Sequence, residues 1–130
     1  MKIDYINDID YIDLLKLYIK YHNSIGSINT DFEYSVKLNK ILEYSGVYTG
    51  IYIDNKIVGF MLITVSGTLG IIEAVYILPR YRVHAKKLYI FTEYICKDIG
   101  IILLSSNYAT NEGKQIGIKL GFSTTGYKEI

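Results

Sequence analysis

The sequence has very little of several residues that small proteins use to brace a fold. Its 130 residues include one cysteine, one proline and no tryptophan. The lone Cys96 excludes an intramolecular disulfide and a thiolate cage for a metal ion, so we expect no metal and a reducing, cytoplasmic setting. No apolar run approaches the roughly 20 residues of a membrane span, and the first residues lack the order of a secretory signal. We therefore expect a soluble protein with no membrane partner.

The chain also lacks an excess of either charge. Lysine and arginine total 14 and aspartate and glutamate total 13, so the formal net charge is +1. This balance gives no direct signal for nucleic-acid binding, which needs a basic surface against the phosphates. Half of the residues are hydrophobic, which excludes disorder, and the length predicts one domain over residues 1–130.

The N-terminal third predicts a strand followed by two helices. Polar and apolar residues alternate over Lys2–Ile6, as in a half-buried strand. A helix is expected from Asn7 or Asp8 to about Asn23–Gly26, and a second one from Asp31 to Ser45-Gly46. The expected buried positions are Ile9, Ile12, Leu15, Tyr18 and Ile19 in the first helix and Phe32, Val36, Leu38, Ile41 and Leu42 in the second.

The middle of the chain predicts a three-stranded antiparallel meander. Its strands cover Val47–Ile53, Lys56–Ser66 and Leu69–Leu78, and the last one stops at the only proline, Pro79. Asp54-Asn55 between the first two strands is typical of a two-residue hairpin turn.

Beyond the proline the pattern predicts helix, strand, helix and strand. Leu88, Phe91, Ile95 and Ile99 recur at helical spacing up to Gly100. The apolar run Ile101–Leu104 is a buried strand, which the helical crossover makes parallel to Leu69–Leu78. The remaining elements are a helix over Asn111–Leu120 and a strand within Phe122–Ile130. The fold class is α/β (α+β): a mixed, mostly antiparallel six-stranded sheet with four helices.

Chemistry is expected where the strand Leu69–Leu78 gives way to a helix. Unbonded backbone N–H groups and the helix dipole at such a junction attract phosphate or pyrophosphate. Lys86 and Lys87 in the first turn oppose the dipole, and an anionic ligand would reverse that penalty. Lysines on a solvated helix start, with no ligand at all, explain the same pattern.

Three segments resemble the GCN5-related N-acetyltransferase (GNAT) superfamily. Gly50–Phe60 is similar to the family's second and third strands, and ends in the usual Gly-Phe. Ile72–Arg82 resembles the fourth strand and its loop, where members read V-x-P-x-Y-R, and Asn111–Phe122 resembles the segment that leads to L-Y-x-x-x-G-F. The ordered set spans nearly the whole chain, so the resemblance implies a GNAT-like acyl-CoA N-acyltransferase fold.

The sequence departs from the family at functionally important places. In the phosphate loop (Q/R)-x-x-G-x-(G/A), Arg82 keeps the first position, but Ala85 and Lys87 replace the two small residues. Gly117 stands where a tyrosine commonly protonates the departing thiolate. Only one strand fits after the last helix, so the family's last strand is missing, and we expect an open sheet edge at Ile101–Leu104 or Tyr127–Ile130 that pairs in a homodimer or with a partner strand.

The resemblance implies acetyl transfer from acetyl-CoA, as co-substrate, to an amine of a small molecule or protein, by direct attack in a ternary complex. It implies Glu73 as a catalytic base and Tyr108 as the acid that replaces the missing tyrosine. An ordinary exposed strand carboxylate, and one chance tyrosine among 14, explain the same two residues. The implied cofactor contacts are Ile77, Leu78, Arg82, Val83, His84, Ala85, Lys86, Lys87, Leu88, Asn107 and Asn111.

Two other functions stay open from the sequence. The altered loop and missing tyrosine allow a catalytically silent GNAT-like interaction or structural module, and a small α/β domain that binds another phosphate ligand is a further alternative. The acidic residues of the first two helices favour a cationic acceptor, although solvated helix faces explain them equally well.

Overall fold

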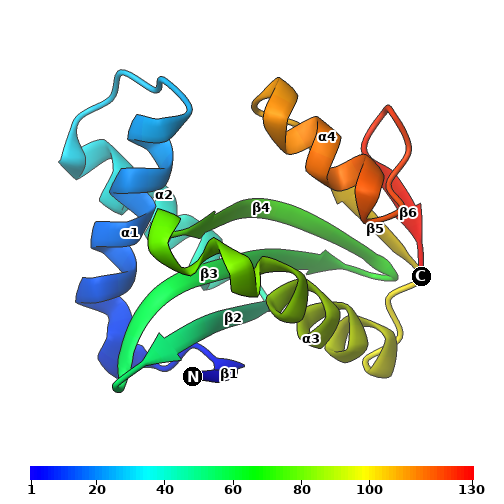
Figure 1. Cartoon of the computed structure of the whole chain (residues 1–130), viewed down its shortest axis with the longest axis horizontal. Coiled ribbons are helices and arrows are strands. Elements are labelled where there is room, and N and C mark those ends of the chain that lie inside the picture. The colour runs from blue at the N-terminus through cyan, green and yellow to red at the C-terminus, as the bar shows by residue number, and fades with distance from the viewer.

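The computed structural model describes all 130 residues, which form one twisted sheet with helices on both of its faces (Figure 1). Two short 3₁₀ helices, Asp8–Asp10 and Pro79–His84, precede α1 and α3. The strands and α-helices are β1 (Lys2–Tyr5), α1 (Tyr11–Ser24), α2 (Asp31–Glu43), β2 (Gly46–Ile53), β3 (Lys56–Ser66), β4 (Leu69–Ile77), α3 (Ala85–Asp98), β5 (Leu103–Ser106), α4 (Asn111–Lys119) and β6 (Tyr127–Glu129).

The sheet runs in chain order from β1 to β6. Neighbouring strands are antiparallel except β4 and β5, which are parallel and joined through α3. The six-stranded mixed sheet with four α-helices, and the single parallel pair, are therefore confirmed. The β2–β3 hairpin turns at Asp54 and Asn55, whose positive φ angles of 50° and 65° suit a two-residue turn.

The sheet separates two hydrophobic cores. On one face α1 and α2 pack against Phe60, Leu62 and Ala74, and on the other α3 packs against Met61 and Ile63. Alternate residues of β3 thus serve opposite cores, which is why this strand is buried along most of its length.

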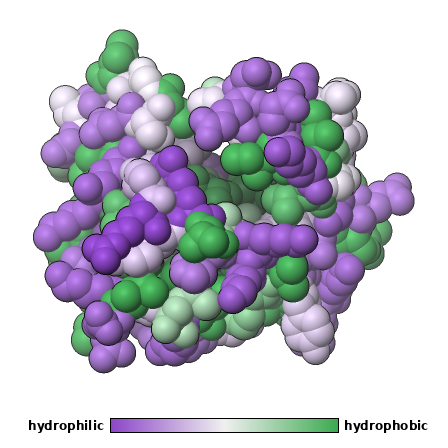
Figure 2. All heavy atoms as spheres, in the orientation of Figure 1, coloured by the Kyte–Doolittle hydropathy of each residue, from purple (hydrophilic) through white to green (hydrophobic).

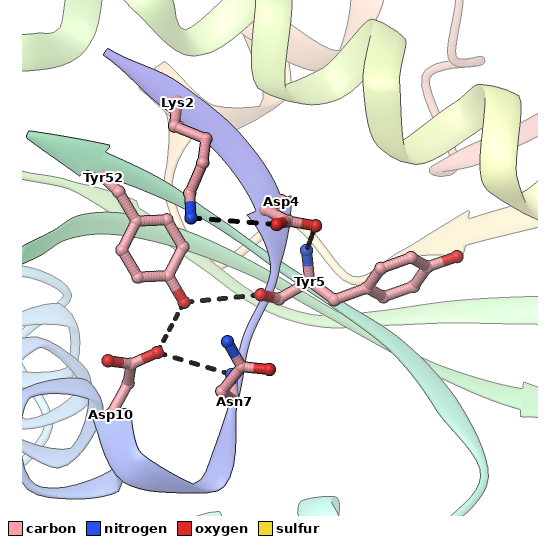
Figure 3. A network of polar contacts seen from close by, with 6 residues as sticks. All are labelled: Lys2, Asp4, Tyr5, Asn7, Asp10 and Tyr52. Atoms are coloured by element: carbon pink, nitrogen blue, oxygen red, sulfur yellow. Dashed lines mark hydrogen bonds and ion pairs between the residues drawn. The ribbon is translucent and has the colours of Figure 1, made fainter. Parts of the chain in front are cut away.

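A polar network ties β1 and β2 to the 3₁₀ helix Asp8–Asp10 that precedes α1 (Figure 3). The buried Tyr52 hydroxyl donates to Asp10 Oδ2 at 2.7 Å, and its burial is the main cause that raises the pKa of this phenol. The Asn7 N–H donates to the same Asp10 oxygen at 3.4 Å, so the chain enters α1 at a fixed angle.

The two N-terminal helices exist as predicted, but the predicted buried faces were partly wrong. Ile9 and Ile12 are 89% and 62% exposed, and Phe32 is 76% exposed. Of the predicted positions, Tyr18 and Leu38 are buried, and Leu15, Ile19, Ile41 and Leu42 are partly buried against the same core, which Leu14, Leu17 and Tyr34 complete. Apolar side chains surround much of α1, so the sequence offers several stripes and the contact with the sheet selects one of them.

The C-terminal strands also differ from the prediction. The strand predicted at Ile101–Leu104 lies two residues later, as β5, and the strand predicted within Phe122–Ile130 is reduced to the three residues of β6. Gly126, with φ of 92°, turns the chain just before β6. Because β6 pairs with β5 from Leu103 to Ser105, the free edge on this side belongs to β6 alone.

Candidate active site

The sheet opens between β4 and β5. Their parallel pairing stops at Ile72 opposite Ser106, whereas β4 continues to Ile77. Residues 74–77 are therefore paired with β3 on one side only. Their other edge offers N–H and C=O groups to a ligand, as an added strand would use them.

A cleft of about 590 Å³ lies over this opening. Figure 2 shows the hollow between the surface of α1 and α2 and that of α4, with hydrophobic atoms on its floor. Four regions form its walls: the end of α1, the second half of β4, the first turn of α3, and α4 with the loop before it. Its lining includes Tyr21, Ser24, Ile25, Glu73, Tyr76, Ile77, Arg82, Ala85, Tyr89, Asn107, Tyr108, Glu112 and Gly117.

Glu73 sits on a β-bulge in the middle of β4. Leu62 of β3 opposes Ala74, and the next residue, Ile63, opposes Ile72, so Glu73 has no partner across the ladder. Its carboxylate accepts a hydrogen bond from Thr64 Oγ1 at 2.8 Å. A bulge re-aims a side chain, and here it brings the carboxylate to the face covered by α1. The negative charge of Glu73 accordingly contributes to the raised pKa values of Tyr18 and Tyr21.

Aromatic side chains build the wall beside Glu73. Tyr21 stacks on Tyr18 with ring centroids 6.1 Å apart and meets Phe60 edge-on at 6.4 Å. Burial is the main cause that raises the pKa of Tyr18 to about 12, and it raises the pKa of Tyr21 in the same way. Both phenols are therefore neutral at physiological pH. No sequence motif marks Tyr21 or Thr64, because only the packing of α1 on β4 and the bulge bring them to the site.

Arg82 provides a positive charge at the end of β4. Its Nε donates to the carbonyl of Ile77 at 3.0 Å, and its guanidinium lies 5.7 Å from the centroid of Tyr76. Arg82 and Ile77 line the cleft. Most of the Ile77 side chain is buried in the core under α3, and its neighbour Leu78 packs half-buried against the same core. The other guanidinium nitrogens make no hydrogen bond within the chain, and guanidinium suits an oxygen anion.

The expected phosphate loop is a 3₁₀ helix that runs straight into α3. Ala85 lines the cleft, but its N–H already donates to the carbonyl of Arg82. Val83 is 81% exposed, and Leu88 is buried in the core. The side chains of His84, Lys86 and Lys87 do not line the cleft, and both lysines are exposed. Of the loop residues singled out from the sequence, the structure brings only Arg82 and Ala85 into the cleft.

Tyr108 and Gly117 form a matched pair on the opposite wall. A Cβ atom at Gly117 would lie 2.6 Å from Tyr108 Cε1 and 2.8 Å from its hydroxyl, so the tyrosine ring occupies the space of a side chain at position 117. The hydroxyl donates to the Ser123 carbonyl at 2.9 Å, and burial raises the pKa of this phenol. Glycine inside a helix costs about 1 kcal/mol relative to alanine, and the ring of Tyr108 explains why α4 carries it.

The two predicted asparagines differ in position. Asn107 lies in the lining of the cleft, whereas Asn111 begins α4 outside it. The helix is capped by Thr110, whose Oγ1 accepts from the Gly113 N–H at 3.0 Å. No group of three or more His, Cys, Asp or Glu side chains is placed to hold a metal ion. None of the helices has both the length and the apolar character needed to cross a bilayer.

Comparisons with known proteins give structural but no sequence matches. No family model and no curated protein matches the sequence. The PaiA N-acetyltransferase of Thermoplasma acidophilum, solved with coenzyme A, superimposes with a TM-score of 0.79 at 18% identity over 99% of this chain and 98% of its own. Glucosamine-6-phosphate N-acetyltransferase of Arabidopsis thaliana gives 0.69 at 22% identity over 94% and 90%.

A third solved structure is similar over the full length of this chain. The aminoglycoside 6'-N-acetyltransferase AAC(6')-Ig of Acinetobacter haemolyticus gives a TM-score of 0.76 at 17% identity over 100% of this chain and 94% of its own. The agreement of these proteins in architecture, at such low identity, establishes the fold: the chain has the acyl-CoA N-acyltransferase fold of the GNAT proteins, as the sequence resemblance implied.

Proposed function

We propose that this chain is an N-acetyltransferase that moves an acetyl group from acetyl-CoA to an amine by direct attack in a ternary complex. The observation that carries the proposal is the splay of β4 from β5, which opens a cleft directly beside the bulged Glu73. The fold adds support, because a solved protein that shares it, the PaiA N-acetyltransferase, was obtained with coenzyme A.

The residues of the cleft fit acetyl-CoA as co-substrate. The free edge of residues 73–77, which includes the backbone of Ile77, can pair with the amides of the pantetheine arm, and Arg82 can meet a phosphate at the end of the strand. Remaining contacts proposed on the resemblance are the backbone at Leu78 and from Val83 to Leu88, together with Asn107 and Asn111. When bound, acetyl-CoA supplies a thioester, whose C–S bond breaks as the amine nitrogen bonds to the carbonyl carbon.

Glu73 and Tyr108 handle the protons in this proposal. The acceptor enters as an ammonium ion, and the Glu73 carboxylate accepts a proton from it, directly or through water, which frees the nitrogen lone pair. Tyr108 donates its hydroxyl proton to the departing thiolate. The nitrogen releases its second proton to solvent, and Tyr108 takes up a proton from solvent to restore its hydroxyl. To protonate the thiolate, the hydroxyl must exchange its bond to the Ser123 carbonyl for one to the sulfur.

One observation favours the alternative of a catalytically silent module. The Ala85 N–H, expected to face a pyrophosphate, is already bonded to Arg82 within the 3₁₀ helix. A chain that had lost acetyl-CoA binding would tolerate this internal hydrogen bond, because its Ala85 N–H would have no phosphate to bind. It would keep the sheet and the free edge of β6 as an interaction surface.

The deciding experiment measures binding and turnover separately. Thermal unfolding with increasing CoA should show a rise in Tm that depends on CoA concentration, because a ligand stabilises only the state that binds it. Thiol release from acetyl-CoA in the presence of a panel of primary amines should exceed the rate without amine. No stabilisation at millimolar CoA would reject the enzyme and support the silent module, whereas stabilisation without thiol release for any amine would reject transfer alone.

We also propose a cytoplasmic homodimer, formed through the short free edge of β6. Light scattering at tens of micromolar should report twice the mass of the chain. Glu129→Pro, which removes a backbone donor from the free edge of this strand, should shift the assembly to the monomer. A strictly monomeric parent protein would contradict the dimer without affecting the acetyltransferase proposal.

A further inference from the structure

The charges within the cleft are few and are separated. Glu73 and Glu112 are its only acidic residues and Arg82 its only basic one, on different elements. Glu73 takes part in none of the ion pairs of the chain, and the hydrogen bond that it accepts comes from the uncharged hydroxyl of Thr64. A carboxylate without a cation, beside phenols that remain protonated, leaves an uncompensated negative charge at this end of the cleft.

The wall next to this charge is aromatic and already ordered. Tyr21 is held from behind by Tyr18 and from the side by Phe60, and it faces the cleft together with Ser24 and Ile25 from the last turns of α1. Tyr76 also lines the cleft, but the guanidinium of Arg82 lies over its ring. Among the tyrosines nearest Glu73, Tyr21 is therefore the one left to receive a ligand.

We infer that the acceptor is a small organic cation with an apolar or aromatic body, and that Tyr21 selects it. This inference rests on the proposed function and names the substrate class of its site. The ammonium group lies between the Glu73 carboxylate and the ring of Tyr21, and the carbon body packs against the remaining aromatic and aliphatic wall. A cation between a carboxylate and an aromatic face gains from both, and desolvation strengthens each contribution.

The lining argues against strongly polar acceptors. The end of α1 contributes only Tyr21, Ser24 and Ile25 to the lining, and the Ser24 hydroxyl already donates to the Tyr21 carbonyl at 2.6 Å. A sugar or a peptide backbone brings several hydrogen-bonding groups, and each would lose water here without a partner. An acceptor whose only polar group is its ammonium ion pays no such penalty.

The test measures binding of three probe compounds by calorimetry, with and without saturating CoA. 2-Phenylethylamine has both the charge and a large apolar body, n-propylamine has the charge but only a short alkyl body, and 2-phenylethanol lacks the charge. We expect 2-phenylethylamine to bind at least about tenfold more tightly than either of the others. Tyr21→Leu should weaken its binding roughly 5- to 30-fold, the size of a desolvated cation–π contact, and Tyr21→Phe should keep it.

Matched variants separate the two contacts from general damage. Tyr94→Leu makes the same replacement on α3 at a side chain that is 71% exposed and outside the cleft, and should leave binding unchanged. Glu73→Gln should abolish the preference for the amine over the alcohol. Each variant's Tm shows whether it is folded, and Tyr21→Phe keeps the packing on Tyr18 if the leucine variant does not fold.

Equal binding of the three probes, or equal effects of Tyr21→Leu and Tyr94→Leu, would overturn the inference. Tighter binding of a short peptide with a free N-terminus would overturn it as well, in favour of a protein acceptor. Because these measurements need no acetyl transfer, loss of the proposed function has a different signature: 2-phenylethylamine binds as expected, but acetyl-CoA releases no thiol.

Discussion

The two ends of the cleft are built on different principles. At the end formed by α1 and the middle of β4, Glu73 is fixed by a bulge, a hydrogen bond and an aromatic wall. At the other end, formed by the start of α3, Arg82 faces the cleft and is held by one hydrogen bond to the Ile77 carbonyl. Lys86 and Lys87 extend into solvent, and the Ala85 N–H is bonded to the Arg82 carbonyl within the 3₁₀ helix. Fixed geometry suits the reacting atoms, whereas exposed charge suits attraction of an anion from a distance.

The largest expected effect comes from the charge at the fixed end. Glu73→Gln preserves the shape of the side chain and removes its ability to take a proton, so kcat should fall by about 10² to 10⁴ while CoA affinity is nearly unchanged. Steady-state kinetics and CoA titration measure the two quantities. Glu112→Gln, in the same cleft but on α4, is the matched control and should retain activity. Full activity of Glu73→Gln would remove Glu73 from the mechanism.

The next largest effect is expected at Arg82, at the other end of the cleft, and it concerns CoA affinity instead of kcat. Arg82→Met removes the only cation that lines the cleft, so CoA affinity should fall roughly 10- to 100-fold, the range for a hydrogen bond to a charged group. At saturating acetyl-CoA, kcat should change little. Arg80→Met removes an exposed arginine of the same 3₁₀ helix that lies outside the cleft, and should be nearly neutral. If both variants bind CoA equally well, the phosphates do not meet Arg82.

The fold was largely predictable from the sequence, because turn signals separate elements with clear periods. Asp54-Asn55 marks the β2–β3 hairpin, and Pro79 ends the region of β4. The buried face of α1 was not predictable, since Ile, Leu and Tyr occur around most of the helix and Ile9 and Ile12 are as apolar as the residues that reach the core. The late start of β5 and the shortness of β6 depend on register against other strands, which no local pattern carries.

The candidate site was only partly predictable. The resemblance predicts Glu73 and Arg82 as site residues, but the bulge that turns Glu73 toward α1 exists only in the pairing of β3 with β4. The sequence predicts that Tyr108 replaces the tyrosine missing at Gly117, but the contact between these two residues is a tertiary fact. Tyr21 resembles 13 other tyrosines of the sequence, so nothing local distinguishes it.

A third prediction concerns the wall shared by both ends. Tyr89 lines the cleft, and its hydroxyl donates to Glu93 Oε1 at 2.6 Å, while Lys128 of β6 lies 2.7 Å from the same oxygen. Burial alone would raise the pKa of Glu93, but the hydrogen bonds from Lys128 and Tyr89 and the nearby lysine charges lower it below its ordinary value of 4.5. The folded state therefore gains stability from ionised Glu93 at neutral pH, and loses it as the pH falls from 4.5 through the lowered pKa.

Glu93→Gln should accordingly reduce the free energy of unfolding by about 1 to 2 kcal/mol at pH 7, with a smaller difference from the parent protein at acid pH. Urea unfolding at several pH values measures this. Glu129→Gln alters an exposed carboxylate of β6, the strand that carries Lys128, and should have little effect at any pH. A Glu93→Gln deficit that stays constant down to pH 3 would show that packing, rather than charge, is what the variant loses.

The smallest effect is expected from Lys86 and Lys87, which are exposed and outside the lining of the cleft. Replacing both with Gln removes only their charge, and should weaken CoA binding about threefold at low salt and hardly at all near 1 M salt, where the Debye length is about 3 Å. Replacing both with Gly also removes the side chains at the positions where the family has small residues. If the lysines act by charge alone, the Gly and Gln variants should bind CoA equally, and the Lys40→Gln/Lys56→Gln control, away from the cleft, should match the parent protein. Tighter binding by the Gly variant would mean instead that the lysines obstruct the phosphates, and the exposed end of the cleft would then be a closed version of the family's loop rather than an electrostatic replacement for it.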